Sequence, residues 1–248
     1  MTSRPDAFIL CGGAGLRLRS VTGDAPKSMA TIAGRPFLEF LLLQLKRCEF
    51  SRVILGVGYQ SRLIQDYFGQ KAFGMDILYS PELFPLGTGG ALRQALDLIT
   101  TDNVLVMNGD SYTDLDLRLF EIEHVKAKAD LTVVVFADER SDAGSVLLDN
   151  EGRITAFAEK RAVQHSHLQS AGIYILDKRL VASIPPEIQI SLEERLFPQW
   201  IEEGQKIKAF VHPGKCIDIG TPERFQRAQE TLRKFELSGN SNCIEGHS

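Results

Sequence analysis

The stretch "ILCGGAGLRLRSVTGDAPKSM", from Ile9 to Met29, decides the expected fold. Its apolar start is followed by three glycines, at Gly12, Gly13 and Gly15. Three basic residues come next, at Arg17, Arg19 and Lys27. Glycine lets a backbone curl so that several N–H groups face one phosphate, and nearby cations add fixed positive charge. The stretch therefore predicts a buried strand that ends in an anion-binding loop. The alternative is a tight strand-to-helix turn with solvated arginines.

Two familiar phosphate loops do not fit this stretch. The dinucleotide fingerprint G-x-G-x-x-G needs a third glycine, but Leu18 stands at that place after Gly13 and Gly15. A P-loop needs Gly-Lys followed by Ser or Thr, and this sequence lacks it. A nicotinamide-dependent dehydrogenase is therefore disfavoured, and a test of nicotinamide binding would decide it.

Outward from the loop, short apolar runs alternate with amphipathic segments, which is typical of parallel βαβ units. Strands are predicted at 7–11, 52–58, 76–80, 103–110, 131–136, 171–176 and 207–213, and helices at 37–48, 61–68, 89–99, 117–129, 191–204 and 221–237. The segment 145–159 predicts two strands joined by a turn at 149–152. Thr221 is the expected cap of the last helix. These patterns predict one α/β domain over 1–237, Rossmann-like, with a mixed, mainly parallel sheet flanked by helices. The residues 238–248 form a polar tail.

Composition limits the function classes. The chain has 248 residues, 44% of them apolar, with a net charge of −4. No basic face for nucleic acid is implied. The four cysteines lack metal or redox spacing, which indicates a reducing compartment. The sequence shows neither a signal-peptide pattern nor a run of about 20 apolar residues. We therefore expect a cytoplasmic protein with no membrane and no nucleic-acid partner.

The motifs from Leu10 onward resemble the sugar-1-phosphate nucleotidyltransferases. The family pattern L-x-G-G-x-G-x-R-L, then P-K, then G-x-P, is matched at Leu10, Gly12, Gly13, Gly15, Arg17, Leu18, Pro26, Lys27, Gly34 and Pro36. Ser28 departs from it, because many members carry proline there. Further segments match in the family's order, at 85–92 (PLGTGGAL), 108–110 (NGD), 157–160 (FAEK), 171–174 (AGIY) and 217–223 (IDIGTPE).

The resemblance implies the nucleotide-diphospho-sugar transferase type of fold and a reaction in which a sugar 1-phosphate attacks a nucleoside triphosphate and pyrophosphate leaves. It implies catalytic roles for Arg17, Lys27 and Lys160. It implies nucleotide contacts for Leu10, Gly12, Gly13, Gly15, Glu82, Gly87, Thr88 and Gly89. It implies sugar contacts for Asn108, Gly109, Gly144, Glu159 and Gly172. Mg²⁺ is the implied cofactor, held by Asp110 and Asp218, since two carboxylates with phosphate oxygens and water suit this hard ion.

Glu82 stands five residues before Gly87, where thymidylyltransferases of the family carry a glutamine that reads the base. An ionised glutamate only accepts hydrogen bonds, and guanine presents two adjacent donors. GTP is therefore the expected triphosphate. The alternative for Glu82 is a solvated loop residue.

The segments "LRSV", "PFLEFLL" and "VGYQ" most resemble the heptose 1-phosphate guanylyltransferases of this family. Guanylyltransferases for mannose 1-phosphate come next, followed by uridylyl- and thymidylyltransferases for hexose 1-phosphates. A non-catalytic sugar-nucleotide sensor is the alternative outside enzymes, and magnesium-dependent pyrophosphate release separates it from an enzyme. A homo-oligomer is left open.

Overall fold

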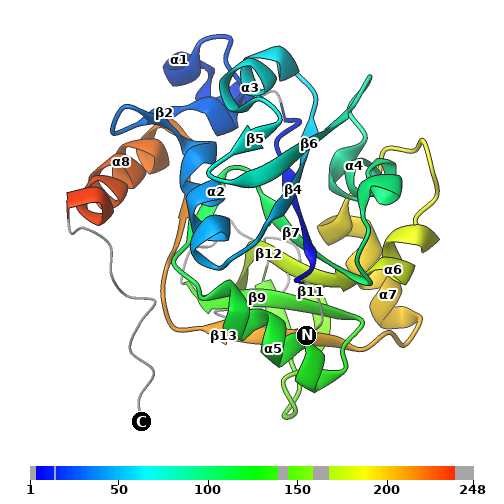
Figure 1. Cartoon of the computed structure of the whole chain (residues 1–248). Helices are drawn as coiled ribbons and strands as arrows, with labels where there is room; N and C mark the ends of the chain where they lie inside the picture. The colour runs from blue at the N-terminus through cyan, green and yellow to red at the C-terminus, as the bar shows by residue number, and fades with distance from the viewer. Residues whose placement is uncertain (1–3, 14, 139–144, 159–167, 238–248) are drawn as a thin grey trace.

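The computed structural model describes residues 4–13, 15–138, 145–158 and 168–237. In that part of the chain, a mixed sheet of ten strands runs through the molecule (Figure 1). Its centre is four parallel strands, in the spatial order β6 (Met75–Pro81), β4 (Arg52–Val57), β1 (Asp6–Leu10) and β7 (Asn103–Asn108). The first strand of the chain, β1, thus has β4 on one side and β7 on the other, and the chain reaches these two neighbours by crossovers in opposite directions. That arrangement opens a ligand crevice at the carboxyl ends of β1 and β7.

The rest of the sheet is mainly antiparallel and, apart from one edge strand beside β6, extends from β7. The next strand is β12 (Leu168–Asp177), which pairs antiparallel with both β7 and β9 (Leu131–Ala137). The remaining strands are β13 (Ile207–His212) beside β9, β10 (Ser145–Leu148), β11 (Ile154–Ala158) and the edge strand β5 (Lys71–Ala72). The predicted mixed sheet with a parallel core is confirmed, and so is the predicted antiparallel pair at 145–159.

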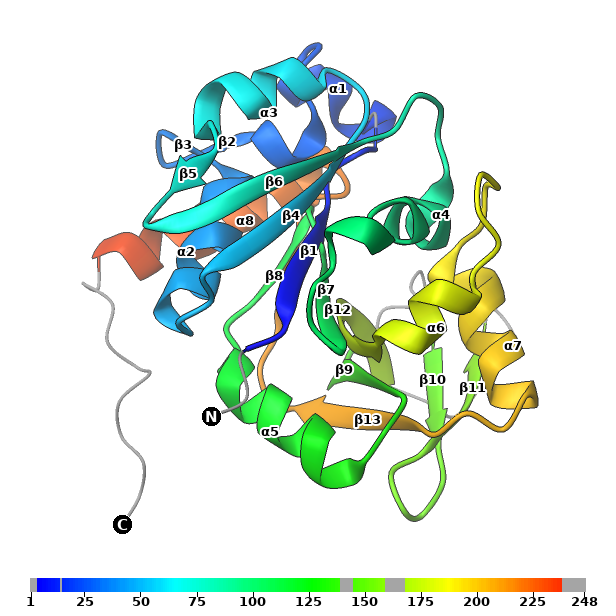
Figure 2. The same cartoon turned by 45° about the vertical axis from the view of Figure 1, so that its right-hand side comes forward.

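Side chains alternate between the two faces of the sheet, so the central strands are buried on both sides. In β1, Ala7 and Ile9 join one apolar cluster, while Phe8 joins the other. The first cluster includes side chains of α2 (Phe37–Arg47), α3 (Ser61–Phe68), α5 (Leu117–Ala127) and α8 (Pro222–Leu237). The second includes those of α4 (Gly87–Gln94), α6 (Lys178–Ser183) and α7 (Phe197–Glu202). Figure 2 shows the two helical layers on either side of the parallel strands.

Two predicted helices each contain a turn of another helical type in the structure. The helix expected at 89–99 begins at Gly87 and ends at Gln94, before the 3₁₀ turn η3 (Leu96–Leu98). The helix expected at 191–204 starts as a π-helical turn, η4 (Leu192–Leu196), and continues as α7. Pro198 has no N–H to donate back to the preceding turn, which accounts for the widened turn.

Short elements around the crevice were not expected from the sequence. They are β2 (Thr31–Ile32), β3 (Arg35–Pro36), β8 (Ser111–Thr113), β14 (Cys216–Asp218), η1 (Leu16–Leu18), α1 (Arg19–Thr22) and η2 (Lys27–Met29). Segments of two to four residues are too short to show a period. The pair β8 and β14 is antiparallel and brings the last third of the chain to the end of β7.

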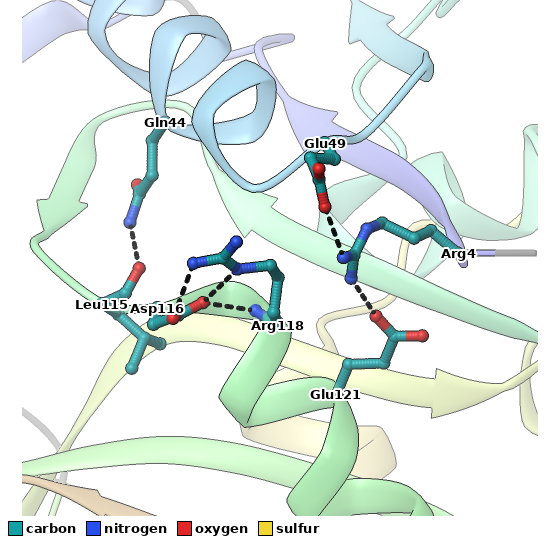
Figure 3. A network of polar contacts seen from close by, with 7 residues as sticks. All are labelled: Arg4, Gln44, Glu49, Leu115, Asp116, Arg118 and Glu121. Atoms are coloured by element: carbon teal, nitrogen blue, oxygen red, sulfur yellow. Dashed lines mark hydrogen bonds and ion pairs between the residues drawn. The ribbon is translucent and has the colours of Figure 1, made fainter. Parts of the chain in front are cut away.

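A polar network anchors the connection from β8 to α5 (Figure 3). Gln44 of α2 donates its amide to the carbonyls of Thr113 and Leu115, at 2.8 and 3.0 Å. Asp116 caps α5 by accepting from the Arg118 N–H at 2.9 Å. The same view shows Arg4 donating to Glu49 and Glu121, at 3.1 and 2.8 Å. These contacts fix the chain that follows the carboxyl end of β7.

The last helix begins as predicted. Thr221 Oγ1 accepts from the Arg224 N–H at 3.3 Å, and Pro222 is the first residue of α8. None of the described helices combines the length and apolar composition that a bilayer crossing requires. The division into a 1–237 domain and a 238–248 tail stays a prediction, since 238–248 lie outside the described residues.

Candidate active site

A cavity of about 500 Å³ lies at the carboxyl ends of β1 and β7. Both strands belong to the parallel core, and the crevice is where an open α/β sheet of this order binds ligands. Its lining comprises Leu10, Cys11, Gly13, Gly15, Arg17, Lys27, Ser28, Gly109, Asp110 and Gly220. Seven of the residues predicted for the site are thus brought together: Leu10, Gly13, Gly15, Arg17, Lys27, Gly109 and Asp110.

The glycine loop lies directly against Lys27. Gly15 has a φ of +59°, and a Cβ there would lie 2.8 Å from the Cβ of Lys27. A side chain at this position would be strained by the backbone and would displace the lysine. A Cβ at Gly13, by contrast, would meet no atom within 4 Å among the described residues beyond its chain neighbours. The loop therefore presents open backbone to the cavity at Gly13 and supports Lys27 at Gly15.

Lys27 and Asp110 form an ion pair beneath this loop. Their Nζ and Oδ2 atoms are 2.5 Å apart. Gly109 makes the pair possible, because its N–H donates to the Leu10 carbonyl at 3.0 Å, and a Cβ there would lie 2.5 Å from that oxygen. Only a residue without a side chain lets the end of β7 approach β1 this closely. Asp110 is thereby held over the cavity.

Asp218 reaches the same place from the other end of the sequence. In the pairing of β8 with β14 it lies opposite Ser111, and the next N–H, of Ile219, donates to the Asp110 carbonyl at 3.0 Å. The Asp218 Oδ1 accepts from the Gly220 N–H at 3.0 Å and from Arg224 at 3.2 Å. Two carboxylates, each beside a cation, thus come together: Asp110 just before β8, and Asp218 in β14, the strand paired with β8.

This donor set fits Mg²⁺. No group of three or more His, Cys, Asp or Glu side chains that could hold a metal occurs in the described part of the chain. A structural zinc site would need four such ligands, whereas Mg²⁺ is bound by one or two carboxylates together with waters and substrate phosphates. Asp110 and Asp218 match the second requirement.

Glu82 contacts the glycine loop from the side of β6. Its Oε2 accepts from the Leu86 N–H at 2.9 Å, and a Cβ at Gly12 would lie only 2.2 Å from its Oε1. Burial raises the pKa of this carboxyl, and the Leu86 N–H partly offsets the rise. Glu82 is thus a half-buried acceptor seated on Gly12, and not a solvated loop residue.

The glycines at the start of α4 have a different neighbour. A Cβ at Gly87 would lie 2.6 Å from the Ile190 carbonyl oxygen, and one at Gly89 would lie 3.2 Å from the same atom. Thr88 Oγ1 donates to Glu193 at 2.8 Å. All three residues face the protein's own chain and do not line the cavity. A contact of theirs with nucleotide stays a prediction.

Asn108 and Gly172 meet beside the cavity. Gly172 has a φ of +72°, and a Cβ there would lie 2.4 Å from the Asn108 amide nitrogen. The Asn108 Oδ1 is buried, and within the described part of the chain it has no hydrogen-bond partner. A buried acceptor without a partner is costly, so a ligand hydroxyl there would stabilise the site. The predicted residues Gly144, Glu159 and Lys160 lie outside the described residues, and their roles stay predictions.

Sequence reasoning missed Arg224, which pairs with Asp218 at the edge of the cavity. Its signal was its place in the first turn of α8, three residues after the predicted cap Thr221. The exposed Arg17 lines the cavity, whereas Arg19 pairs with Asp24 at 2.6 Å on the surface.

Fold and site together define a nucleotide-binding α/β protein of the nucleotide-sugar transferase type, with a glycine loop, a lysine and two carboxylates at one crevice. The chain belongs to the Nucleotidyl transferase family, whose model matches residues 6–234. It is 34% identical to D-glycero-alpha-D-manno-heptose 1-phosphate guanylyltransferase of Aneurinibacillus thermoaerophilus, over 93% of this chain and 99% of that protein. It is 36% identical to Mannose-1-phosphate guanylyltransferase of Mycobacterium tuberculosis, over 93% of this chain and 65% of that protein.

The fold of this chain also matches a solved structure. The crystal structure of HddC from Yersinia pseudotuberculosis complexed with GMP-PN matches with a TM-score of 0.81 and 32% identity. The match covers 92% of this chain and 100% of that one.

Proposed function

We propose that this protein transfers GMP from GTP to a sugar 1-phosphate, with D-glycero-α-D-manno-heptose 1-phosphate as the sugar substrate. A phosphate oxygen of the sugar phosphate attacks the α-phosphorus of GTP. The bond between the α-phosphorus and the bridging oxygen breaks, and pyrophosphate leaves with that electron pair. The observation that carries the transfer reaction is the Lys27–Asp110 pair beneath the open glycine loop, with Asp218 on the adjacent strand.

Charge neutralisation is the main task of such a site, because two highly charged anions must meet. The N–H groups of the loop around Gly13 are proposed to bind the triphosphate, and Arg17 and Lys27 to offset its charge. A phosphate monoester dianion is already a nucleophile near neutral pH, so the chain need not supply a general base. Lys160, by the family resemblance, grips the sugar phosphate.

Asp110 and Asp218 would hold Mg²⁺. When bound, the ion would neutralise phosphate charge and polarise the α-phosphorus. Lys27 pairs with Asp110, and Arg224 pairs with Asp218.

Recognition of guanine is proposed for Glu82. Its Oε1 lies at the glycine loop, and its Oε2 is oriented by the Leu86 N–H. An ionised carboxylate there can accept from the two adjacent donors of guanine, N1–H and the 2-amino group. The guanylyltransferase relatives and the GMP-PN complex of a 32% identical structure support the same base.

The second candidate function is transfer of GMP to mannose 1-phosphate, which the Mycobacterium tuberculosis relative supports. Heptose 1-phosphate stands first because its guanylyltransferases align over 99% and 96% of their lengths. One experiment separates the candidates: magnesium-dependent pyrophosphate release with heptose, mannose and glucose 1-phosphates against GTP, UTP, dTTP and ATP. We expect the highest kcat/KM for GTP with heptose 1-phosphate. A preference for UTP or dTTP would refute the guanine assignment, and no release from any pair would leave a sugar-nucleotide sensor.

A further inference from the structure

The carboxylate of Glu193 accepts hydrogen bonds from three hydroxyl groups. Its Oε2 accepts from Thr88 Oγ1 at 2.8 Å and from Ser191 Oγ at 3.0 Å. Its Oε1 accepts from the Tyr174 hydroxyl at 2.9 Å. Thr88 Oγ1 in turn accepts from the Leu192 N–H at 2.8 Å. Hydrogen bonds to an ionised acceptor are about twice as strong as neutral ones, so this carboxylate is a firm junction.

One arm of the junction leads to the proposed base site. Thr88 is the second residue of α4, and the Leu86 carbonyl just before it accepts from the Ile190 N–H at 2.8 Å. The Leu86 N–H is the group that orients Glu82. Fixing Thr88 therefore fixes where the loop that carries Glu82 joins the helix.

The other arm leads to the proposed sugar site. The Tyr174 hydroxyl accepts from Ser170 Oγ at 3.4 Å, and Ser170 Oγ accepts from the Gly172 N–H at 3.2 Å. These contacts span an irregularity in β12, where the register against β9 shifts between Ser170 and Tyr174. Gly172 lies inside that bulge and packs against Asn108. Bulges next to sites aim the residues they carry, and the Tyr174 hydroxyl braces this one.

We propose that Glu193 is a positioning residue that holds the base side and the sugar side of the site in register. The proposal rests on the proposed function, because it concerns the two substrates of that reaction. Tyr174 and the neighbouring Leu192, Leu196 and Phe197 belong to one buried apolar cluster. A carboxylate beside such a cluster carries a desolvation cost, which its three hydroxyl donors offset.

The test compares five single variants of the full chain. Glu193→Ala removes the junction, and Glu193→Gln keeps an acceptor for Tyr174. Thr88→Val and Tyr174→Phe each remove one arm with little change of shape. Glu194→Ala is the matched control, because this exposed neighbour loses the same charge. KM for each substrate, kcat and the melting temperature are measured for all.

We expect Tyr174→Phe to raise mainly the KM for the sugar 1-phosphate, and Thr88→Val mainly the KM for the triphosphate. Glu193→Ala should raise both by about tenfold, the worth of one hydrogen bond to a charged group. Glu193→Gln should lie between it and the wild type, and Glu194→Ala should match the wild type. In the double variant Thr88→Val/Glu193→Ala, the KM for the triphosphate should be no higher than in Glu193→Ala.

A Glu193→Ala chain that melts earlier but keeps both KM values would overturn the proposal and assign the network to stability alone. The proposal also fails if Thr88→Val and Tyr174→Phe raise the same KM, or if the double variant shows the sum of the single effects. The activity of the wild type distinguishes failure of the role of Glu193 from failure of the proposed function. An active wild type with any of these results rejects only the role of Glu193, and an inactive wild type rejects the proposed function as well.

Discussion

Two glycine-rich segments follow strands of the parallel core, and the structure uses them in opposite ways. After β1, a Cβ added at Gly13 would meet no atom within 4 Å in the part of the chain that the structure describes, and Gly13 and Gly15 line the cavity. After β6, Cβ atoms at Gly87 and Gly90 would lie 2.6 and 2.5 Å from the carbonyl oxygens of Ile190 and Ile188. The first segment is open to a ligand, and the second is covered by the protein's own chain.

The difference shows what can be inferred from a run of glycines in a sequence. Such a run indicates that another group lies close to the backbone, but it does not indicate whether that group is a phosphate or another part of the chain. At α4 the N–H groups of Gly89 and Gly90 already donate to the Ile190 carbonyl, at 2.9 and 3.3 Å. Hydrogen-bond partners therefore distinguish the two uses where sequence does not.

The largest effect is expected where the open segment meets its carboxylates. Asp110→Asn and Asp218→Asn should each lower kcat by about 10²–10³-fold, because each removes one charge from the proposed ligands of Mg²⁺. Pyrophosphate release at several Mg²⁺ concentrations measures the loss. Asp114→Asn, on the connection after β8, is the control and should keep activity. Near-wild-type turnover of either site variant would remove that carboxylate from the metal assignment.

Alanine at one glycine of each segment tests the comparison itself. Gly87→Ala should destabilise the fold by about 2–5 kcal/mol, the combined cost of a positive φ and of overpacking against Ile190. The melting temperature should fall by more than about 5 °C. Gly13→Ala should keep the melting temperature and raise the KM for the triphosphate. Equal melting temperatures of the two variants would contradict the contrast between the segments.

Glu82→Gln probes the contact between the segments. The GTP/UTP ratio of kcat/KM should fall by about 10- to 100-fold, which corresponds to about 1.5–3 kcal/mol for a hydrogen bond to a charged group. The KM for the sugar 1-phosphate should stay the same. Glu194→Gln, an exposed glutamate elsewhere, serves as the control. An unchanged nucleotide ratio would show that Glu82 holds the loop through Leu86 and does not read the base.

Removal of single cations should separate the two substrates. Arg17→Ala should raise the KM for the triphosphate by about tenfold, since Arg17 lines the cavity at the open segment. Lys160→Ala should instead raise the KM for the sugar 1-phosphate. Binding and steady-state measurements on both variants check this. Equal losses for both substrates in both variants would sink the division of roles.

The smallest effect is a shared dependence of stability on pH. His124 of α5 is buried against β9, where its Nδ1 shares a hydrogen bond of 2.7 Å with Thr132 Oγ1. Burial lowers the pKa of His124 to about 4. A lowered histidine pKa means that the folded state resists protonation. Stability is then full above about pH 6.5 and falls toward pH 4, by about 1 kcal/mol at pH 5.5. Melting curves should show the same fall in Gly13→Ala and Gly87→Ala, and a His124→Gln chain should lose it.

The sequence was most informative where the structure is most apolar. The strands at β1, β4, β7 and β9 and the helix α2 lie where apolar runs and helical spacing predicted them, because both faces of the central sheet are buried. Elements such as β8 and β14 were not predicted, since a strand of three residues shows no period and the pairing of these two strands joins distant parts of the chain.

The candidate site was predictable to the extent that family motifs mark it. Lys27, Asp110, Gly13 and Gly15 line one cavity, and their roles in it stay predictions. The contact of Gly87 with Ile190 was not predictable, because the sequence near Gly87 does not indicate which distant segment packs against it. Arg224 was missed for a similar reason, since only the folded structure shows that the first turn of α8 lies against Asp218.

The pairing of β8 with β14 also determines when, during synthesis, the site becomes complete. A nascent chain that has left the ribosome as far as α5 already contains β1, Lys27 and Asp110. Asp218 is translated only after β9 to β13, and it is needed beside Ser111 to complete the carboxylate pair. Because a domain folds as a unit, and β9, β12 and β13 belong to the same sheet as β1 and β7, we expect the crevice to be completed only after the second half has been made. A chain terminated before Asp218 would therefore lack one of the two carboxylates that are proposed to hold Mg²⁺.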